Sequence, residues 1–295
     1  MKFGTYFAYW EQDWDTNYLK YVKKVSDLGF DVLEVGAAGI VNMTDEDLYA
    51  LKAEAEKYNI TLTAGIGLPK EYDVSSPDEK VRQNGIDFMK KILHALHKAG
   101  IHKIGGTIYS YWPVDYTKPI NKQEARKQSI QSMKELADYA SQYEITLLIE
   151  TLNRFEQFLV NDAKEAVELV EDIGKDNVKV MLDTFHMNIE EDSIGDAIRY
   201  TGDYLGHLHI GECNRKVPGK GHMPWGEIGQ ALRDINYDGY IVMEPFVRPG
   251  GIVGSDIKVW RDLSDNADEA KLDADIKESL QFIKKEFSSH SHLAK

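Results

Sequence analysis

The chain has 295 residues, a length that fits one α/β barrel of about 250 residues with additional helices. Its formal net charge of -14 repels phosphate backbones, which argues against a nucleic-acid partner and suits a neutral ligand. The single cysteine excludes an intramolecular disulfide framework, and no apolar run resembles a signal peptide or a membrane span, so we expect a cytoplasmic protein without a membrane partner.

Short β-rich runs alternate with longer segments of helical periodicity, which is the signature of repeated βα units and a parallel sheet. Eight strands are predicted, at Phe3–Tyr6, Val32–Val35, Thr61–Ala64, Lys103–Thr107, Thr146–Glu150, Val178–Leu182, Leu205–His209 and Tyr240–Glu244. Gly29 and Gly100 mark helix ends ahead of the second and fourth strands. With no linker or break in composition between the halves, the pattern favours a single (β/α)₈ TIM-barrel domain over residues 1–295. A doubly wound open sheet is the alternative.

After the eighth strand the chain continues beyond the repeated βα pattern. A glycine-rich segment covers Pro249–Gly254, and an additional C-terminal helix is predicted from about Asp268 to Phe287. The tail that follows contains His290 and His292, but a short terminal pair of histidines is more typical of a solvated end than of a metal site. We assign this tail no function.

Polar side chains end four otherwise apolar strands, at Glu150, Asp183, His209 and Glu244. Successive members lie roughly one βα unit of about 30 residues apart, so a barrel places them around one rim, at the strand C-termini where such enzymes keep their sites. One carboxylate there is as often an ordinary surface group, but four such residues together predict a metal site. Three carboxylates and one imidazole favour Mn²⁺, Co²⁺ or Mg²⁺ over a thiolate-selecting metal.

Two histidines of the seventh strand compete for the role of ligand. His207 and His209 are two residues apart, so their side chains share one face of a regular strand. His209 lies nearer the C-terminal end and is the predicted ligand. We expect His207 to support a ligand from behind or to pack in the core.

Six longer motifs accompany these residues, at Tyr6–Trp10, Tyr109–Pro113, Glu150–Glu156, Asp183–Asn188, His209–Arg215 and Met243–Phe246. In them the sequence resembles the D-tagatose 3-epimerase and D-psicose (D-allulose) 3-epimerase family, and the resemblance runs along nearly the whole chain. It implies an isomerase that interconverts C3 epimers of free keto-sugars, D-fructose with D-psicose and D-tagatose with D-sorbose. It also implies a homodimer or homotetramer that binds one divalent metal ion per subunit, usually Mn²⁺ or Co²⁺.

The resemblance assigns roles to further residues of the site. It implies that the four strand-end residues bind the metal, that Glu156, His186 and Arg215 hold the hydroxyls and carbonyl of the sugar, and that Tyr6, Trp112 and Phe246 form an apolar wall. Arg215 offers fixed donors to a developing enolate oxygen. Aromatic side chains also serve as ordinary core residues, so the wall is the weaker assignment. The family pattern does not extend to the loop Gly65–Lys70 at the rim of the pocket, so the sequence does not predict which ketose is preferred.

Removing the proton at C3 of a ketose leaves the negative charge of a cis-enediolate, and inversion requires proton-transfer groups on opposite faces of the sugar. Glu150 and Glu244 are predicted to be these two catalytic groups. Metal coordination stabilises a carboxylate and weakens it as a base, so we expect each glutamate to place one oxygen on the metal and the other toward carbon.

Three other functions remain open on the sequence alone. An aldose-ketose isomerase of the same barrel superfamily would use similar residues to move a proton between C1 and C2. An endonuclease-IV-like phosphodiesterase would need more histidines, several metals and a basic groove, which the acidic balance opposes. A non-catalytic sugar-binding protein would need the pocket but no paired bases.

Overall fold

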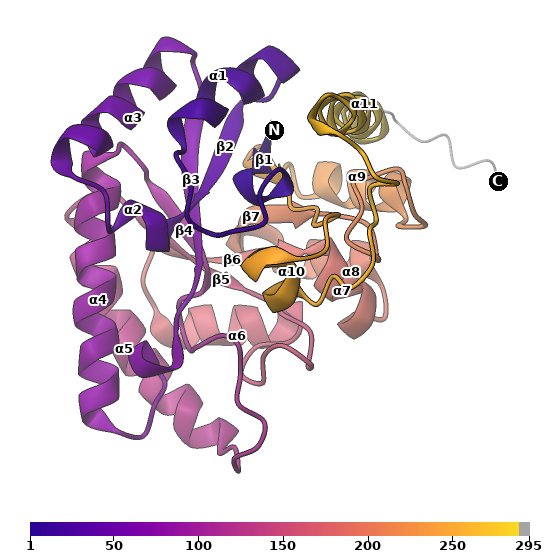
Figure 1. Cartoon of the computed structure of the whole chain (residues 1–295). Helices are drawn as coiled ribbons and strands as arrows, with labels where there is room; N and C mark the ends of the chain where they lie inside the picture. The colour runs from indigo at the N-terminus through magenta and orange to yellow at the C-terminus, as the bar shows by residue number, and fades with distance from the viewer. Residues whose placement is uncertain (289–295) are drawn as a thin grey trace.

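A closed barrel of eight parallel strands forms the centre of the protein in a computed structural model that describes residues 1–288 (Figure 1). The strands are β1 (Lys2–Tyr6), β2 (Val32–Gly36), β3 (Thr61–Gly67), β4 (Lys103–Thr107), β5 (Thr146–Glu150), β6 (Val178–Asp183), β7 (Leu205–Ile210) and β8 (Tyr240–Met243). Each strand pairs with the next along the chain, and β8 pairs with β1, which places Gly4 opposite Val242. This closure confirms the predicted barrel and excludes the open sheet, because an open sheet would leave two unpaired edges.

Helices surround the barrel and follow the strands in turn (Figure 1). The longer helices are α1 (Leu19–Leu28), α3 (Asp45–Lys57), α4 (Glu79–Lys98), α5 (Lys122–Ser141), α6 (Ala163–Ile173), α8 (Ile194–Thr201), α9 (Trp225–Asp234) and α11 (Glu269–Ser288). The shorter ones are α2 (Ala37–Ile40), α7 (Thr184–Glu190) and α10 (Gly251–Ile257), with 3₁₀ turns at Phe7–Tyr9, Lys70–Tyr72 and Gly202–Tyr204. None of the helices within residues 1–288 combines the length and the apolar character that a membrane crossing demands.

Local capping chemistry sets where the outer helices begin and end. Side chains of Thr44, Asp78 and Asp162 accept a backbone N–H in the first turn of α3, α4 and α6, as capping residues do. Gly29 ends α1 with φ 94°, and Gly100 follows α4 with φ 69°, a left-handed conformation that costs glycine little. Both predicted helix stops are confirmed.

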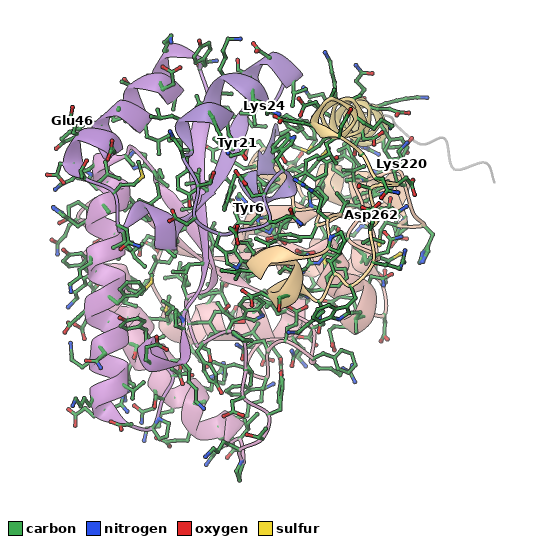
Figure 2. All side chains as sticks on the ribbon, in the orientation of Figure 1. Tyr6, Tyr21, Lys24, Glu46, Lys220 and Asp262 are labelled. Carbon is green, nitrogen blue, oxygen red and sulfur yellow. The ribbon has the colours of Figure 1, made fainter. Side chains whose placement is uncertain are left out.

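The predicted C-terminal helix is α11, and it fills the place in the outer layer between α1 and α9 (Figure 1). Its buried Phe287 lies with its ring centroid 6.4 Å from that of Phe3 and 6.3 Å from that of Trp225. Near its other end, Asp273 pairs with Lys24 of α1, labelled in Figure 2, at 3.0 Å. The helix therefore completes the ring after β8. The histidine-containing tail beyond it lies outside the described residues.

The first loop and α10 together form one wall above the barrel. Gln12 Nε2 donates to Pro249 O at 2.6 Å, and Val253 N donates to Gln12 O at 2.9 Å. Trp14 Nε1 donates to Asp256 Oδ2 at 2.8 Å. Because all strands are parallel, their C-terminal ends meet on this side, and the glycine-rich segment after β8 closes over it.

The position of Phe287 makes α11 important for stability. Replacing it with alanine removes a large, 1% exposed side chain, so we expect Phe287→Ala to lower the free energy of unfolding by about 3–5 kcal/mol in urea denaturation. Tyr49→Ala, at a 54% exposed aromatic of α3, is the matched control and should change stability by about 0.5 kcal/mol or less. Equal effects of the two substitutions would contradict the assigned role of α11.

Candidate functional site

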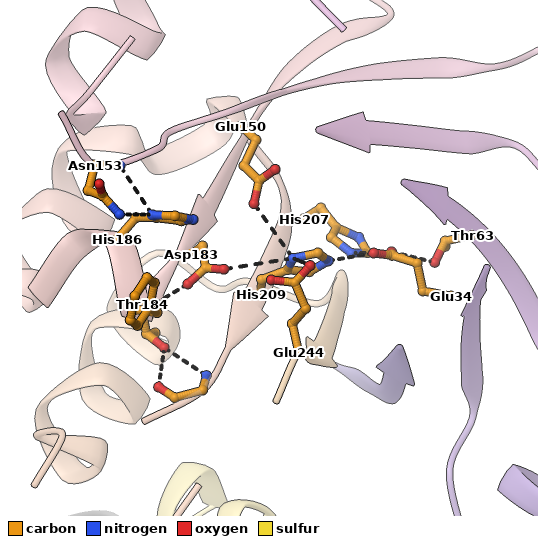
Figure 3. Close-up of polar contacts among 12 residues, drawn as sticks. Glu34, Thr63, Glu150, Asn153, Asp183, Thr184, His186, His207, His209 and Glu244 are labelled. Atoms are coloured by element: carbon orange, nitrogen blue, oxygen red, sulfur yellow. Dashed lines mark hydrogen bonds and ion pairs between the residues drawn. The ribbon is translucent and has the colours of Figure 1, made fainter. Parts of the chain in front are cut away.

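Four side chains from neighbouring strand ends meet above the barrel (Figure 3). Glu150 ends β5, Asp183 ends β6, His209 lies in β7, and Glu244 follows β8. One ligand atom of each lies within 4.8 Å of the others. His209 Nδ1 is 3.5 Å from Glu244 Oε1, 3.7 Å from Glu150 Oε1 and 3.9 Å from Asp183 Oδ2. The structure therefore brings together all four predicted ligands.

The other nitrogen of His209 contacts a carboxylate below the site. His209 Nε2 lies 2.5 Å from Oε1 of Glu34, a buried residue of β2. Because a carboxylate only accepts, Nε2 carries the proton of this hydrogen bond, and Nδ1 of the neutral ring holds a lone pair. No residue within 1–288 forms a hydrogen bond with Nδ1. A lone pair that faces three carboxylates requires a positive charge between them.

The electrostatics of the histidine agree with this requirement. Burial lowers the pKa of the His209 imidazole, but the Glu34 and Glu244 carboxylates outweigh burial and leave that pKa well above its usual value. The site therefore attracts either a proton or a metal ion to Nδ1. A bound divalent ion and a proton compete for the same lone pair.

The distances in the four-residue group fit a metal ion. Bonds of about 2.0–2.2 Å from one ion to nitrogen and oxygen ligands place those atoms roughly 3–4 Å apart, as observed around Nδ1. Glu34, His207 and His209 form a second close group. Within it, however, the 2.5 Å separation of Glu34 Oε1 and His209 Nε2 is a hydrogen-bond distance that leaves no room for an ion between them. The oxygen-rich group fits Mn²⁺, Co²⁺ or Mg²⁺.

The three carboxylates of the site differ in how their surroundings shift their pKa values. Burial raises the pKa of Glu150 well above its usual range, and it raises the pKa of Asp183 to about 7 although the Arg215 guanidinium opposes that shift. Burial also raises the pKa of Glu244, but His209 and Arg215 outweigh it and the net shift is downward. A nearby divalent cation favours the charged form of every carboxylate, and so it would lower all three pKa values.

Arg215 is buried beside two of these carboxylates. Its Nη1 donates to Glu244 Oε2 at 3.1 Å and lies 3.4 Å from Asp183 Oδ2. Its guanidinium carbon sits 3.7 Å from the centroid of the Phe185 ring, a cation–π arrangement. The charges of Asp183 and Glu244 raise the pKa of Arg215 against the effect of burial, so the residue stays cationic.

Asn153 sets the orientation of two predicted sugar-binding residues. Asn153 N and Nδ2 lie 3.1 and 2.8 Å from Nδ1 of His186, and the backbone N–H donates to it. Burial, together with the nearby Arg215 charge, lowers the pKa of His186, which favours the neutral ring. Because Nδ1 accepts the backbone N–H of Asn153, the proton of the ring is assigned to Nε2, which lies 3.4 Å from Arg215 Nη2. Asn153 Nδ2 also donates to Glu156 Oε1 at 3.1 Å, and Trp112 Nε1 donates to Oε2 at 3.2 Å.

A cavity of about 560 Å³ opens beside the four-residue group. Of the predicted site residues, its lining includes Tyr6, Trp112, Glu150, Glu156, His186, His209, Arg215, Glu244 and Phe246. Asp183 lies deeper and is 1% exposed. The loop Gly65–Lys70 contributes part of the rim. Apart from Asp183, therefore, every residue predicted for the site reaches one cavity.

Sequence reasoning missed several residues of this cavity, among them Trp14 and Glu34. Trp14 stands 6.2 Å from Phe246 and 6.4 Å from Tyr6 between ring centroids, and it extends the aromatic wall. It carried no signal, because its place depends on how the first loop folds over the barrel. The sequence did carry a signal for Glu34, because it is the single carboxylate within the apolar strand Val32–Gly36.

Comparisons with known proteins agree with this geometry. Residues 22–286 match the family model described as xylose isomerase-like TIM barrel. The D-psicose 3-epimerase of Ruminiclostridium cellulolyticum is 52% identical over 292 residues, which cover 99% of this chain and 100% of that protein.

Two solved structures of D-psicose 3-epimerases superpose on nearly the whole chain. One, in the presence of D-fructose, has a TM-score of 0.97 and 51% identity, and the match covers 98% of this chain and 100% of that one. The other, from Clostridium cellulolyticum H10 with D-tagatose, has a TM-score of 0.97 and 52% identity with the same coverage. The resemblance found in the sequence is confirmed, and the chain belongs to the D-psicose 3-epimerase family, built on the xylose isomerase-like TIM barrel.

Proposed function

We propose that the chain is a metal-dependent ketose 3-epimerase that interconverts D-fructose with D-psicose and D-tagatose with D-sorbose. The observation that carries the proposal is the meeting of Glu150 and Glu244 around the unpaired Nδ1 of His209, beside a cavity of about 560 Å³. The relatives crystallised with D-fructose and D-tagatose support the choice of free ketohexoses as substrates. As a carbohydrate epimerase the chain falls in the isomerase class.

The residues that would hold the metal ion are Glu150, Asp183, His209 and Glu244. A divalent ion supplies Lewis-acid stabilisation of negative charge on the sugar oxygens. The chain adds its own charge at the same place, because the buried Arg215 guanidinium lies next to Glu244 and reaches the cavity. The neutral His186 presents an N–H donor. Fixed donors of this kind stabilise an enediolate oxygen more than the carbonyl from which it forms.

In this proposal Glu150 and Glu244 move the proton at C3. They approach His209 from opposite sides in the view of Figure 3. One removes the proton from one face of the sugar, and the other delivers a proton to the opposite face, which inverts the carbon. Glu244 Oε2 accepts a hydrogen bond from Arg215, whereas Glu150 accepts none from an arginine within residues 1–288. The two groups are therefore not equivalent, as two epimeric substrates require.

Besides the roles of the site residues, four further expectations from the sequence stay predictions. They are the identity of the metal as Mn²⁺ or Co²⁺ with Mg²⁺ as a third candidate, the homodimer or homotetramer, the cytoplasmic location, and the single catalytic domain over residues 1–295. The lone Cys213 suits a reducing compartment and supports the proposed location.

Removal of the metal should abolish turnover. We expect dialysis against a chelator to stop the conversion of D-fructose to D-psicose, and Mn²⁺ or Co²⁺ to restore it, because the proposed ligands would otherwise hold uncompensated negative charge. Sugar analysis by chromatography, together with metal analysis of the same sample, measures this. Full activity in a verified metal-free sample would refute the proposed metal dependence.

Substitutions should separate metal binding from substrate activation. We expect Asp183→Asn and His209→Ala to weaken Mn²⁺ binding in calorimetry by more than the roughly 10–100-fold typical of losing a residue behind the ligands. Arg215→Ala removes a cation from beside the carboxylates and should retain the metal, while kcat/KM falls about 10²–10³-fold as for the loss of one anion-stabilising donor. Metal loss in Arg215→Ala would contradict this division of roles.

Reaction in D₂O tests the chemistry itself. We expect NMR to show deuterium at C3 of the epimerised ketose, and Glu150→Gln and Glu244→Gln each to slow epimerisation by about 10²–10⁴-fold, the usual contribution of a proton-transfer group. The metal content of each variant must be matched to that of the wild type, because both residues are also proposed ligands. An aldose labelled at C1 or C2 would indicate an isomerase instead. Near-normal turnover in either variant would exclude the two-glutamate mechanism.

A further inference from the structure

A buried carboxylate occupies the barrel interior beneath the proposed metal site. Glu34 of β2 is 2% exposed, and its Oε1 lies 2.5 Å from His209 Nε2 (Figure 3). Its Oε2 accepts a hydrogen bond from Thr63 Oγ1 at 2.7 Å and lies 3.0 Å from His207 Nε2. Both oxygens of Glu34 therefore face polar groups of the neighbouring strands.

We propose that Glu34 is a positioning residue that fixes His209 in the tautomer with its proton on Nε2, so that Nδ1 is the atom presented to the metal ion. The inference rests on the proposed metal site. It assigns a role to a residue that touches neither the ion nor the reacting carbon.

The neighbours of Glu34 along its strand give no structural reason for a carboxylate there. Val32, Leu33 and Val35 of the same strand are fully buried apolar residues. Burying a carboxylate in the barrel interior is costly unless hydrogen bonds compensate for the lost water. The donors that surround Glu34 reduce this cost, but an apolar side chain would have avoided it. The carboxylate is therefore best explained by what it does to His209.

The hydrogen bond has two effects on the imidazole. It holds the ring by its far edge, so that Nδ1 points at Glu150, Asp183 and Glu244. It also places negative charge next to the donated proton, which makes the opposite nitrogen a stronger metal ligand. Without the carboxylate the ring could exchange tautomers, which would turn an N–H toward the ion, or flip, which would turn the C–H of Cδ2 toward it.

Two other roles for Glu34 fit the geometry less well. A general base at C3 needs an unengaged oxygen, but Oε1 and Oε2 both lie within hydrogen-bond distance of protein groups. A ligand for a second ion, shared with His207, would need more than the 2.5 Å between Glu34 Oε1 and His209 Nε2. His207 instead contacts the far side of the same carboxylate, in agreement with the prediction that it supports or packs rather than coordinates.

The test measures metal affinity in the full-length metal-free protein, without reference to turnover. Mn²⁺ is titrated by calorimetry, and Co²⁺ by its visible absorption, which reports the ligand geometry. We expect Glu34→Gln, which keeps the size and removes the charge, to weaken Mn²⁺ binding about 10–100-fold and to shift the Co²⁺ spectrum. Glu34→Asp, which keeps the charge and withdraws the acceptor from His209, should also weaken binding and provides a second variant if the first does not fold.

The matched control is Thr63→Val, an isosteric change that removes a donor to Oε2 of the same carboxylate and leaves the bond between Oε1 and His209 in place. We expect it to keep the Mn²⁺ affinity and the Co²⁺ spectrum of the wild type. Thermal unfolding of each metal-free variant shows whether it is folded.

The outcomes separate this inference from the proposed function. If the wild type takes up no divalent ion, the proposed metal site itself fails. If the wild type binds Mn²⁺ and folded Glu34→Gln or Glu34→Asp binds it equally well, the site stands and the role of Glu34 is overturned. Equal losses in Thr63→Val and Glu34→Gln would also overturn it, because they would indicate a general effect of core packing.

Discussion

The site is organised around one electrostatic constraint, the concentration of carboxylates about a single imidazole. Glu34, Asp183, Glu150 and Glu244 surround His209, and all but the partly exposed Glu244 are buried. Arg215 supplies one positive charge, which is too little for this number of carboxylates. Buried charges of one sign either take up protons or bind a cation, because neither water nor distance can screen them. A divalent ion bound at Nδ1, as proposed, would satisfy this need.

Hydrogen bonds that cap a helix and order a loop also hold these charged side chains in place. Asp183 caps α7, since its Oδ1 accepts Phe185 N at 2.6 Å, and this leaves Oδ2 directed at His209. Glu212 organises the loop after β7, since its carboxylate accepts Gly219 N at 2.7 Å and Trp225 Nε1 at 2.8 Å. That loop carries Arg215 with a left-handed φ of 66°. This conformation costs energy in a residue other than glycine, and the surrounding hydrogen bonds offset that cost. The guanidinium therefore stays beside the site.

The sequence predicts the parts of this arrangement that follow from strand topology. Once eight βα units are recognised, Glu150, Asp183 and His209 are expected on one rim, because the C-terminal ends of all strands in a parallel barrel lie on the same side. Glu244 follows β8 by one residue and was predicted as its last member, a difference that leaves it on the same rim. The predicted C-terminal helix was also found, although only the structure shows that α11 completes the outer ring.

The features that the sequence did not reveal depend on contacts between distant segments. Trp14 joins the aromatic wall because the first loop is bonded to α10, and no local pattern encodes that contact. The sequence predicts Glu34 only as part of a strand. The alternation of side chains along a strand does not show which interior side chain contacts His209. A carboxylate in an otherwise apolar strand was the available signal, and it can be interpreted only when a buried partner is known.

In the proposed mechanism, the same burial that favours a bound cation would also preserve the basicity of Glu150. A carboxylate bound to a divalent ion is a weak base, since the ion stabilises its charged form. Burial acts in the opposite direction and raises the pKa of Glu150. The rings of Tyr6, Trp14 and Phe246 line the cavity, and apolar walls of this kind limit the access of water to a site. If these walls were open, water would screen the carboxylates, and the ion alone would then set their basicity. In the proposed mechanism the aromatic wall would therefore support proton transfer as well as contact the sugar.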